Sequence, residues 1–360
     1  MSFTLRKTSS VRTNEITEQI SVAFDYVFDG ESVFDCVIPD IPDDYKIGLI
    51  VGSSGSGKST ILNTLGRHED FLWPPNEAVV SSFKDADDAK NRLSGVGFNS
   101  VPSWMRPYSV LSTGEKFRAD MAISIKDNAC IDEFTSVVDR VVARSCACAI
   151  NRYINAAGFK KVTFSSCHKD IIDWLQPCWI YDTDAMKLLD RGAARRPDIT
   201  VNLYPCNTDV WPLFSRHHYL TGDLNKSSRC WVATWEGQAV GFTAIIAFPN
   251  GNFMNAWREH RTVVLPEYQG LGLGVRISDA VGKMVLLDGG RYFSKTAHYR
   301  MGEYRENSPL WVGTSKNKKS RKDYNYSGST KEDKYKHLHA KRVCYSHEYM
   351  GVKQDDEDFA

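Results

Sequence analysis

The 360-residue sequence lacks the patterns that mark secreted, membrane-spanning and repeat proteins. No apolar run reaches the roughly 18 residues of a membrane span, and residues 1–20 are polar where a secretory signal has an apolar core. The nine cysteines form no C-x-x-C pair, which disfavours a zinc ribbon or a disulfide scaffold. No segment recurs at a fixed period, which disfavours a solenoid. We therefore expect a cytoplasmic protein without a membrane partner, and with reduced, mostly buried cysteines.

The overall charge of +1 conceals an uneven distribution along the chain. Between Ser315 and Arg342 there are ten Lys and Arg residues against three Asp and Glu, a local charge of +7, interleaved with tyrosines. A basic, aromatic segment is typical of nucleic-acid binding, although a solvated loop explains it equally well. Residues 351–360 form an acidic tail.

A glycine loop of the type that holds a nucleoside triphosphate follows the apolar run Tyr45–Val51. The run predicts a buried strand, and a strand that leads through such a loop into a helix is the context that a phosphate loop requires. Backbone N–H groups would hold the phosphates, Lys58 would reach the β and γ oxygens, and Ser59 would bind Mg²⁺. The predicted phosphate-binding residues are Gly52, Gly55, Gly57, Lys58, Ser59 and Thr60.

Three more motifs follow in order, at 111–115 (LSTGE), 129–133 (ACIDE) and 167–170 (CHKD). With the phosphate loop they resemble the ATP-binding cassette (ABC) family: signature, acidic strand end and switch histidine. Asp132 would then organise Mg²⁺, Glu133 would polarise the attacking water, and His168 would contact the γ-phosphate. The resemblance implies that Ser112 and Gly114 bind the nucleotide of an opposite subunit, so that ATP holds a homodimer together.

Two departures separate this sequence from the transporter ATPases of that family. Residues 61–110 contain no glutamine, so the glutamine of the family's Q-loop is missing, with Asn99 as a candidate replacement. Only 53 positions separate Lys58 from Leu111, which leaves little room for the subdomain that docks on membrane partners. We also expect a strand at residues 20–28, because the residues alternate. By resemblance Phe24 or Tyr26 would stack on adenine there, although either would serve equally well in a core.

The second half carries a different glycine loop, Gln269–Gly274. Residues 231–242 predict a hairpin that turns at Glu236-Gly237, residues 261–266 predict a strand, and residues 275–287 predict a helix. Strand, Q-x-x-G-x-G loop and helix resemble motif A of the GNAT acetyltransferases, which implies acetyl-CoA as cofactor. Its pyrophosphate would lie on the helix N-terminus, held by the loop residues Gln269, Gly270, Gly272 and Gly274.

The acid and base of acyl transfer are less specifically marked. GNAT enzymes often use a carboxylate on the strand before the loop as base and a tyrosine beyond the next strand as acid. Glu259 fits the first position, and Tyr304 or Tyr299 fits the second. A surface carboxylate and a core tyrosine explain these residues equally well.

The sequence thus predicts an α/β protein with an ABC-type P-loop ATPase domain at 1–195, a GNAT-like α+β acyltransferase domain at 196–350 and the tail. We expect a cytoplasmic ATP hydrolase that uses ATP, Mg²⁺ and acetyl-CoA to acylate a large substrate. Nucleic acid is the favoured substrate, bound through Lys316 to Arg342. The alternative is an ATP-driven regulatory switch whose GNAT-like domain binds a partner without catalysis.

Overall fold

The computed structural model describes residues 3–28, 30–190, 196–218, 223–249, 253–319 and 343–352. The chain forms two compact units. The first comprises Met1–Val96 and Pro107–Pro197, and the second comprises Gly97–Arg106 and Asp198–Ala360. The predicted mixed α/β fold is confirmed, but the short segment Gly97–Arg106 belongs to the second unit although its neighbours in sequence belong to the first.

The first unit is built on a five-stranded sheet in the order β4-β5-β3-β6-β7. Strands β3 to β6 run parallel and β7 pairs antiparallel with β6 at one edge. Every residue of β3 and β5 is buried, as expected for strands covered on both faces. The strands are β3 (Ile47–Val51), β4 (Cys130–Ile131), β5 (Val162–Ser166), β6 (Trp179–Asp182) and β7 (Lys187–Asp190).

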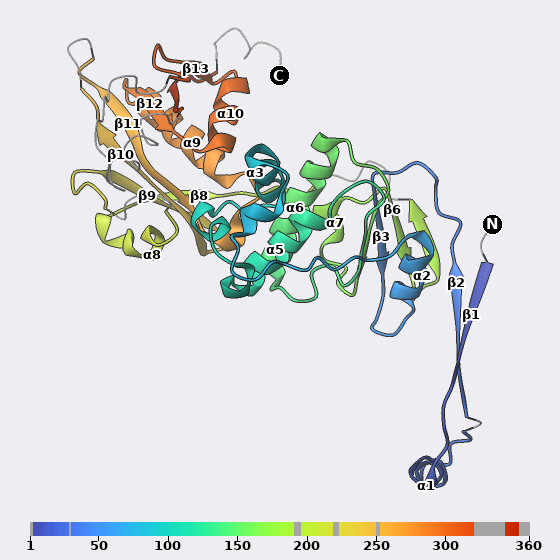
Figure 1. Cartoon of the computed structure of the whole chain (residues 1–360). Helices are drawn as coiled ribbons and strands as arrows, with labels where there is room; N and C mark the ends of the chain where they lie inside the picture. The colour runs from blue at the N-terminus through green and yellow to red at the C-terminus, as the bar shows by residue number, and fades with distance from the viewer. Residues whose placement is uncertain are drawn as a thin grey trace. The chain divides into compact units, whose positions relative to one another are not determined.

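The helices of this unit lie between the strands in sequence (Figure 1). The strand and the helix that the phosphate-loop motif predicts are both present, as β3 and α2. The helices are α2 (Lys58–Leu65), α3 (Ala86–Gly95), α5 (Thr113–Ser124), α6 (Arg140–Ala157) and α7 (Ile172–Leu175), with the 3-10 turns η1 (Val79–Ser82) and η2 (Tyr108–Val110).

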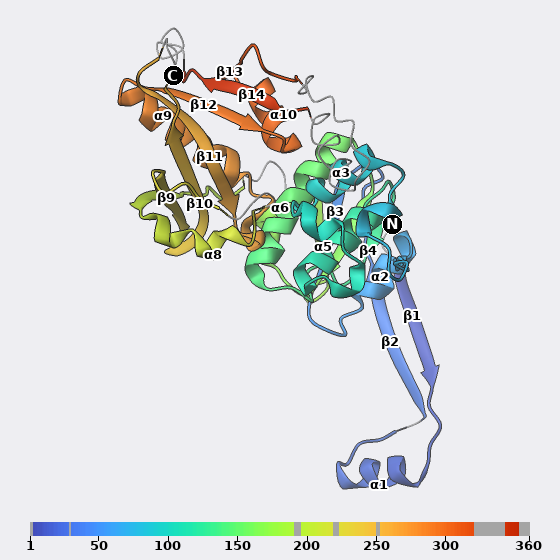
Figure 2. The same ribbon diagram turned by 60° about the vertical axis from the view of Figure 1, so that its left-hand side comes forward.

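An antiparallel hairpin of β1 (Phe3–Ser10) and β2 (Glu31–Ile38) precedes this sheet, with helix α1 (Glu15–Ala23) at its far end (Figure 2). The prediction of a strand at residues 20–28 is wrong, because Ile20–Ala23 belong to α1. A capping box between Asn14 and Thr17 starts this helix, and none of its residues is buried. Phe24 and Tyr26 directly follow α1, which lies at the end of the hairpin away from α2 (Figures 1 and 2), and both are exposed. This position contradicts their expected place on adenine.

The second unit contains a seven-stranded sheet in the order β13-β14-β12-β11-β10-β9-β8. All neighbours pair antiparallel except β11 and β12, which are parallel. The hairpin predicted to turn at Glu236-Gly237 is confirmed. The strands are β8 (Asn202–Cys206), β9 (Arg229–Trp235), β10 (Gln238–Ala247), β11 (Ala256–Val264), β12 (Arg291–Thr296), β13 (Trp311–Gly313) and β14 (Tyr345–Tyr349).

Two clusters of buried side chains form the core of the second unit. One joins α8 to β9, β10 and β11 through Trp211, Phe214 and Phe242, and the other joins α9 to β10, β12 and β14 through Val281, Tyr292 and Tyr349. The predicted helix at 275–287 is confirmed as α9. The helices are α4 (Val101–Trp104), α8 (Pro212–Ser215), α9 (Leu273–Leu287) and α10 (Tyr299–Asn307), with the 3-10 turns η3 (Thr208–Val210) and η4 (Pro266–Tyr268).

Candidate functional sites

The predicted nucleotide-binding residues of the first unit gather at one edge of its sheet. Because β3, β4, β5 and β6 run parallel, the segments that follow them leave from the same edge. These segments are the phosphate loop after β3, Asp132 and Glu133 after β4, His168 after β5, and Asp184 after β6. The order β4-β5-β3-β6 makes the acidic strand end and the phosphate loop second neighbours across β5.

The phosphate loop has the backbone of an anion cradle. Gly55 and Gly57 have φ of 78° and 90°, and Gly57 precedes the first turn of α2 without a side-chain cap. The amide groups of that turn are therefore left for an anion. Lys58 Nζ donates to the carbonyl oxygens of Gly52 and Ser53, at 3.0 and 2.6 Å, so its ammonium folds back over the loop that it is predicted to serve.

The two predicted magnesium ligands, Ser59 and Asp132, interact electrostatically. The Asp132 carboxylate accepts a hydrogen bond from Ser165, and interaction with the Ser59 hydroxyl lowers its pKa. Burial raises the pKa of Asp132, but the hydrogen bonds from Ser165 and Ser59 outweigh it and leave the pKa below its ordinary value. The carboxylate is thus ionised near neutral pH, as a cation ligand must be. Within the described ranges, no group of three or more His, Cys, Asp or Glu side chains could hold a metal ion.

Glu133, His168 and Ser112 are exposed or half-buried. Glu133 is exposed and adopts φ of 50°, which is uncommon for a residue with a side chain. The pKa of His168 is lowered by partial burial and by Arg140, which keeps the ring neutral at physiological pH. Ser112 is the N-cap of α5 and forms a capping box with Glu115, with Gly114 in the first turn.

Asp184 is a residue of this edge that sequence reasoning missed. Its carboxylate accepts from the Ser53 N–H at 2.9 Å and the Ser53 hydroxyl at 2.7 Å, which ties the phosphate loop to the end of β6. Asn99, the candidate for the missing Q-loop residue, lies in the second unit, and its N–H donates to the Gln269 side chain at 3.2 Å. The Q-loop role of Asn99 stays a prediction.

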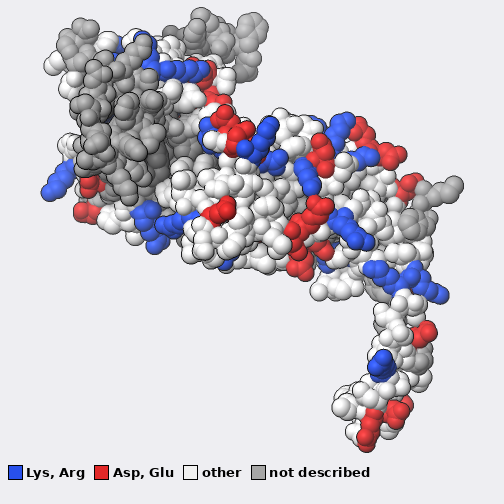
Figure 3. All heavy atoms as spheres, in the orientation of Figure 1, with Lys and Arg blue, Asp and Glu red and all other residues white. Residues whose placement is uncertain are grey.

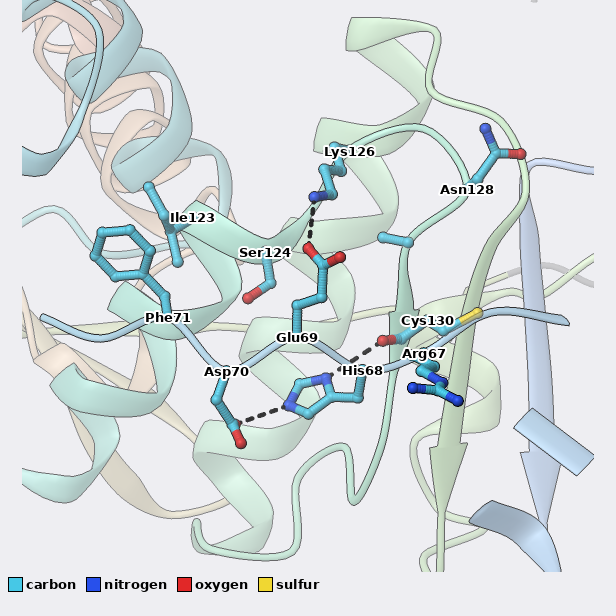
Figure 4. Close-up of a pocket in the computed structure, with 11 residues that line it drawn as sticks. Arg67, His68, Glu69, Asp70, Phe71, Ile123, Ser124, Lys126, Asn128 and Cys130 are labelled. Atoms are coloured by element: carbon cyan, nitrogen blue, oxygen red, sulfur yellow. Dashed lines mark hydrogen bonds and ion pairs between the residues drawn. The ribbon is translucent and has the colours of Figure 1, made fainter. Parts of the chain in front are cut away.

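A polar pocket of about 270 Å³ lies near the start of β4 (Figure 4). His68 contacts Asp70 at 3.3 Å and the Cys130 carbonyl at 3.3 Å, and Lys126 pairs with Glu69 at 3.0 Å. None of the predicted site residues lines this pocket.

The second glycine loop leads into α9 as predicted. Gly270 and Gly272 have φ of 95° and 80°, and Gly272 precedes the helix without a side-chain cap. The predicted ligand Gln269 turns inward instead, because its side chain donates to the Val264 carbonyl at 3.1 Å. Gly274 packs near β11, where an added Cβ would lie 3.6 Å from Val264. The loop thus offers backbone N–H groups at the start of a 15-residue helix.

Strands β11 and β12 part close to this loop. Their register pairs three positions only, ending at Arg258 with Phe293. The register between β10 and β11 also shifts, since Ile245 faces Glu259 while Ala244 faces Arg261, which leaves His260 as an extra residue. A bulge of this kind bends a strand, and beyond it β11 has an edge that β12 does not cover.

Both predicted proton-transfer residues, Glu259 and Tyr304, already have hydrogen-bond or ion-pair partners within the second unit. Glu259 is buried and pairs with Arg305 at 2.8 Å, and it accepts from Ser294 and Thr262. Burial raises its pKa, but Arg305 and these hydroxyls outweigh burial and lower it. The Tyr304 hydroxyl donates to Asp279, and burial and this carboxylate raise the pKa of Tyr304. The alternative interpretation of Glu259 as a surface carboxylate is therefore wrong.

Most of the predicted nucleic-acid segment and most of the acidic tail lie outside the described residues, which stop at 319, resume at 343 and end at 352. Lys318 is described, and it pairs with Glu306 at 3.1 Å. Among the described helices, none combines the length and the apolar character needed to cross a membrane.

Comparison with known proteins identifies part of the second unit. A family model described as acetyltransferase (GNAT) domain matches residues 226–305, a range that contains the hairpin, the glycine loop, α9 and β12. A search of the curated proteins finds no match.

Among solved structures, the chain is similar to the ribosomal-protein-S18-alanine N-acetyltransferase from Escherichia coli, with 10% identity and a TM-score of 0.31 over 44% of this chain and 98% of that one. It is similar to an IAA acetyltransferase from Bacillus cereus, with 12% identity and a TM-score of 0.29 over 42% and 100%. It is also similar to Naa50 from Arabidopsis thaliana, with 12% identity and a TM-score of 0.31 over 41% and 97%. It is the family model, matched over residues 226–305, that identifies a GNAT acetyltransferase domain in this chain.

Proposed function

We propose that this protein is an ATPase coupled to an acyltransferase that uses acetyl-CoA to modify a large substrate. The observation that carries the acyl-transfer half is the GNAT family match over a segment whose glycine loop opens the uncapped helix α9. The cradle fits an anion of the size of a pyrophosphate, because backbone N–H groups and the helix dipole converge there. Acetyl-CoA would bind through this loop and supply the activated acetyl thioester.

The edge of β11 that β12 does not cover would bind the extended, amide-bearing part of acetyl-CoA. An unpaired strand edge presents N–H and C=O groups at regular spacing, and an extended ligand that carries amide groups can pair with them. Beyond Arg258 that edge is free of β12. The cofactor would then enter between the parting strands, with its phosphates at Gly270 and Gly272.

Proton transfer is the step for which the assigned residues fit least well. Glu259 is held in an ion pair with Arg305, and the Tyr304 hydroxyl donates a hydrogen bond to Asp279. Either group must leave its partner before it can serve as base or acid. These contacts favour the second candidate function, in which the domain binds a CoA-bearing or acylated partner without catalysis and ATP acts as a switch.

For the first unit, the observation that supports ATP binding is the uncapped start of α2 after the phosphate loop, where Ser59 interacts with the Asp132 carboxylate. Mg²⁺ would be held by Ser59 and Asp132, where it would neutralise phosphate charge. Lys58 would move from the Gly52 and Ser53 carbonyls to the phosphates. Glu133 would orient water, and His168 would contact the γ-phosphate. By resemblance to the ABC family, Ser112 and Gly114 would complete the site of a second copy in an ATP-dependent homodimer.

The acyl-transfer proposal is tested by following release of free CoA thiol from acetyl-CoA, with nucleic-acid and protein pools supplied separately. Radiolabel recovered in one pool names the acceptor class. Acetyl-CoA binding without label transfer to either pool would support the switch and contradict an acyltransferase. Label in nucleic acid alone would support a role for Lys316 to Arg342.

The ATPase proposal is tested with Glu133→Gln. This change removes the carboxylate that orients water but keeps the phosphate contacts, so ATP binding should persist while turnover falls at least about 100-fold. Chromatography with ATP should also reveal a dimer. Normal turnover in this variant, together with a monomer only, would contradict the assignment.

A further inference from the structure

The β1–β2 hairpin is anchored beside the phosphate loop by its inward-facing residues. Leu5 packs against the buried cluster that contains Cys36, Ile38 and Ile61, the last of these on α2. The Tyr181 hydroxyl on β6 donates to the Val37 carbonyl at 3.0 Å. Since α1 at the other end buries no residue, these contacts fix one end of the hairpin against α2 (Figures 1 and 2).

This anchoring brings Lys7 to the first turn of α2. Side chains two apart on a strand share a face, so Lys7 points to the same side as Leu5. Lys7 Nζ donates to Thr60 Oγ1 at 3.2 Å, and Thr60 is the third residue of α2. In register with Leu5, Cys36 on β2 has its sulfur 3.9 Å from the Gly57 carbonyl oxygen. Figure 3 shows basic side chains where the hairpin meets the rest of this unit.

The charge on Lys7 has no acidic partner among the described residues, since its hydrogen bond goes to a neutral hydroxyl. Lys58 lies over the Gly52 and Ser53 carbonyls of the loop. Two ammonium groups therefore lie at the cradle, one from its own helix and one from a separate hairpin. Arg6, which faces the opposite side of β1, is paired with Asp35 at 2.7 Å.

We propose that Lys7 is a second phosphate ligand of the nucleotide site, and that it binds the phosphate nearest the nucleoside. This inference rests on the proposed ATP-binding function. Lys58 in a phosphate loop reaches the β and γ oxygens, so the second cation, held at Thr60 in the first turn of α2, is left for the α-phosphate. Lys7 would exchange its bond to the Thr60 hydroxyl for a charge-assisted bond to that phosphate.

The test compares dissociation constants for ATP and ADP by calorimetry in the full chain. Lys7→Ala should weaken both nucleotides by a similar factor of about ten, because both carry the α-phosphate. Lys58→Ala should weaken ATP more than ADP. Arg6→Ala is the matched control, since it removes the same charge from the same strand on the opposite face, and it should change neither constant more than about twofold.

Three further results separate the possible failures. Lys7→Arg should recover most of the affinity, because the cation is retained, and unchanged urea midpoints would show that the variants fold. Lys7→Ala with wild-type affinity, in a protein that binds ATP, would overturn this inference alone. A wild-type chain that binds neither nucleotide would overturn the ATP-binding function and the role of Lys7 with it.

Discussion

At the scale of single residues, the ion pair between Glu259 and Arg305 is buried in the second unit. Their side chains are 8% and 1% exposed. Two charges removed from water are tolerated only when they are paired and hydrogen-bonded. Arg305 meets this requirement by donating also to Ser278 at 2.9 Å and to Ser294. The pair thus holds α9, α10, β11 and β12 together at the point where β11 and β12 part.

We predict that Arg305→Met destabilises the protein by about 3–5 kcal/mol, because it leaves the Glu259 carboxylate buried without a partner. Adding Glu259→Gln should recover a large part of that loss, since the uncompensated charge is then gone. Urea unfolding of the two single variants and the double variant measures the coupling. Losses that simply add would show that the two residues act independently.

His298, the N-cap of α10, should make stability depend on pH. Burial, assisted by Arg305 and Arg300, lowers its pKa to about 4 from 6.5. Between these values the unfolded chain binds a proton that the folded chain does not, so the free energy of unfolding falls as pH falls from about 6.5 to 4. His298→Asn keeps a capping acceptor for the Met301 N–H, and should lose less stability than wild type between pH 7 and pH 4.5. Parallel curves from urea titrations at both values would contradict this assignment.

At the scale of helices and strands, local patterns predicted the elements that carry the two glycine loops and failed at the N-terminal hairpin. The apolar run before the first loop predicted β3, because burial of a strand is visible in its own residues. The strand predicted at residues 261–266 overlaps only the end of β11, which is mostly half-buried and carries charged residues. Alternation at residues 20–28 predicted a strand, yet α1 ends at Ala23. The decisive signal was the capping pair Asn14 and Thr17, which starts the helix five or six residues earlier.

Helix α9 gives a test of the coenzyme cradle. Gly272→Glu should lower acetyl-CoA affinity at least about tenfold and leave ATP affinity unchanged, because it brings a like charge to the helix N-terminus. Gly272→Asn is the matched control. Asparagine tolerates the left-handed backbone that Gly272 adopts at φ of 80°, so it should bind acetyl-CoA better than the glutamate variant. Equal affinity in wild type and both variants would show that the loop is only a turn.

At the scale of the whole chain, the sequence predicted two units but missed the contacts that depend on distant pairing. Asn99 and Gln269 are 170 positions apart, and no local pattern connects them. The partner of Glu259 could not be identified either, because Arg305 lies on α10, two elements after α9, and reaches β11 only through tertiary packing. The grouping of the loops that follow β3, β4 and β5 in the first unit was easier to predict, because parallel strands bring their carboxyl ends to one edge of the sheet.

The second unit combines residues 97–106 with residues 198–360, so a fragment of residues 198–360 alone should be less stable than the full chain. Residues 198–360 without Gly97–Arg106 lack part of their own unit, including the N–H that Gln269 accepts beside the glycine loop. We expect this fragment to bind acetyl-CoA more weakly than the full chain and to unfold at lower urea. Supplying residues 97–106 through a linker should restore both properties. Full affinity in the bare fragment would show that this segment contributes nothing.

The same arrangement has a consequence for how the protein is made. The ribosome delivers the chain at about 5–20 residues per second, so the 170 positions between Asn99 and Gln269 take roughly 8 to 34 seconds to emerge. During that interval Phe98 and Trp104, both buried in the finished protein, have no second unit to join. Early synthesis therefore leaves an apolar stretch in the nascent chain, and residues 97–106 are a segment that a chaperone would shield until the second unit is made.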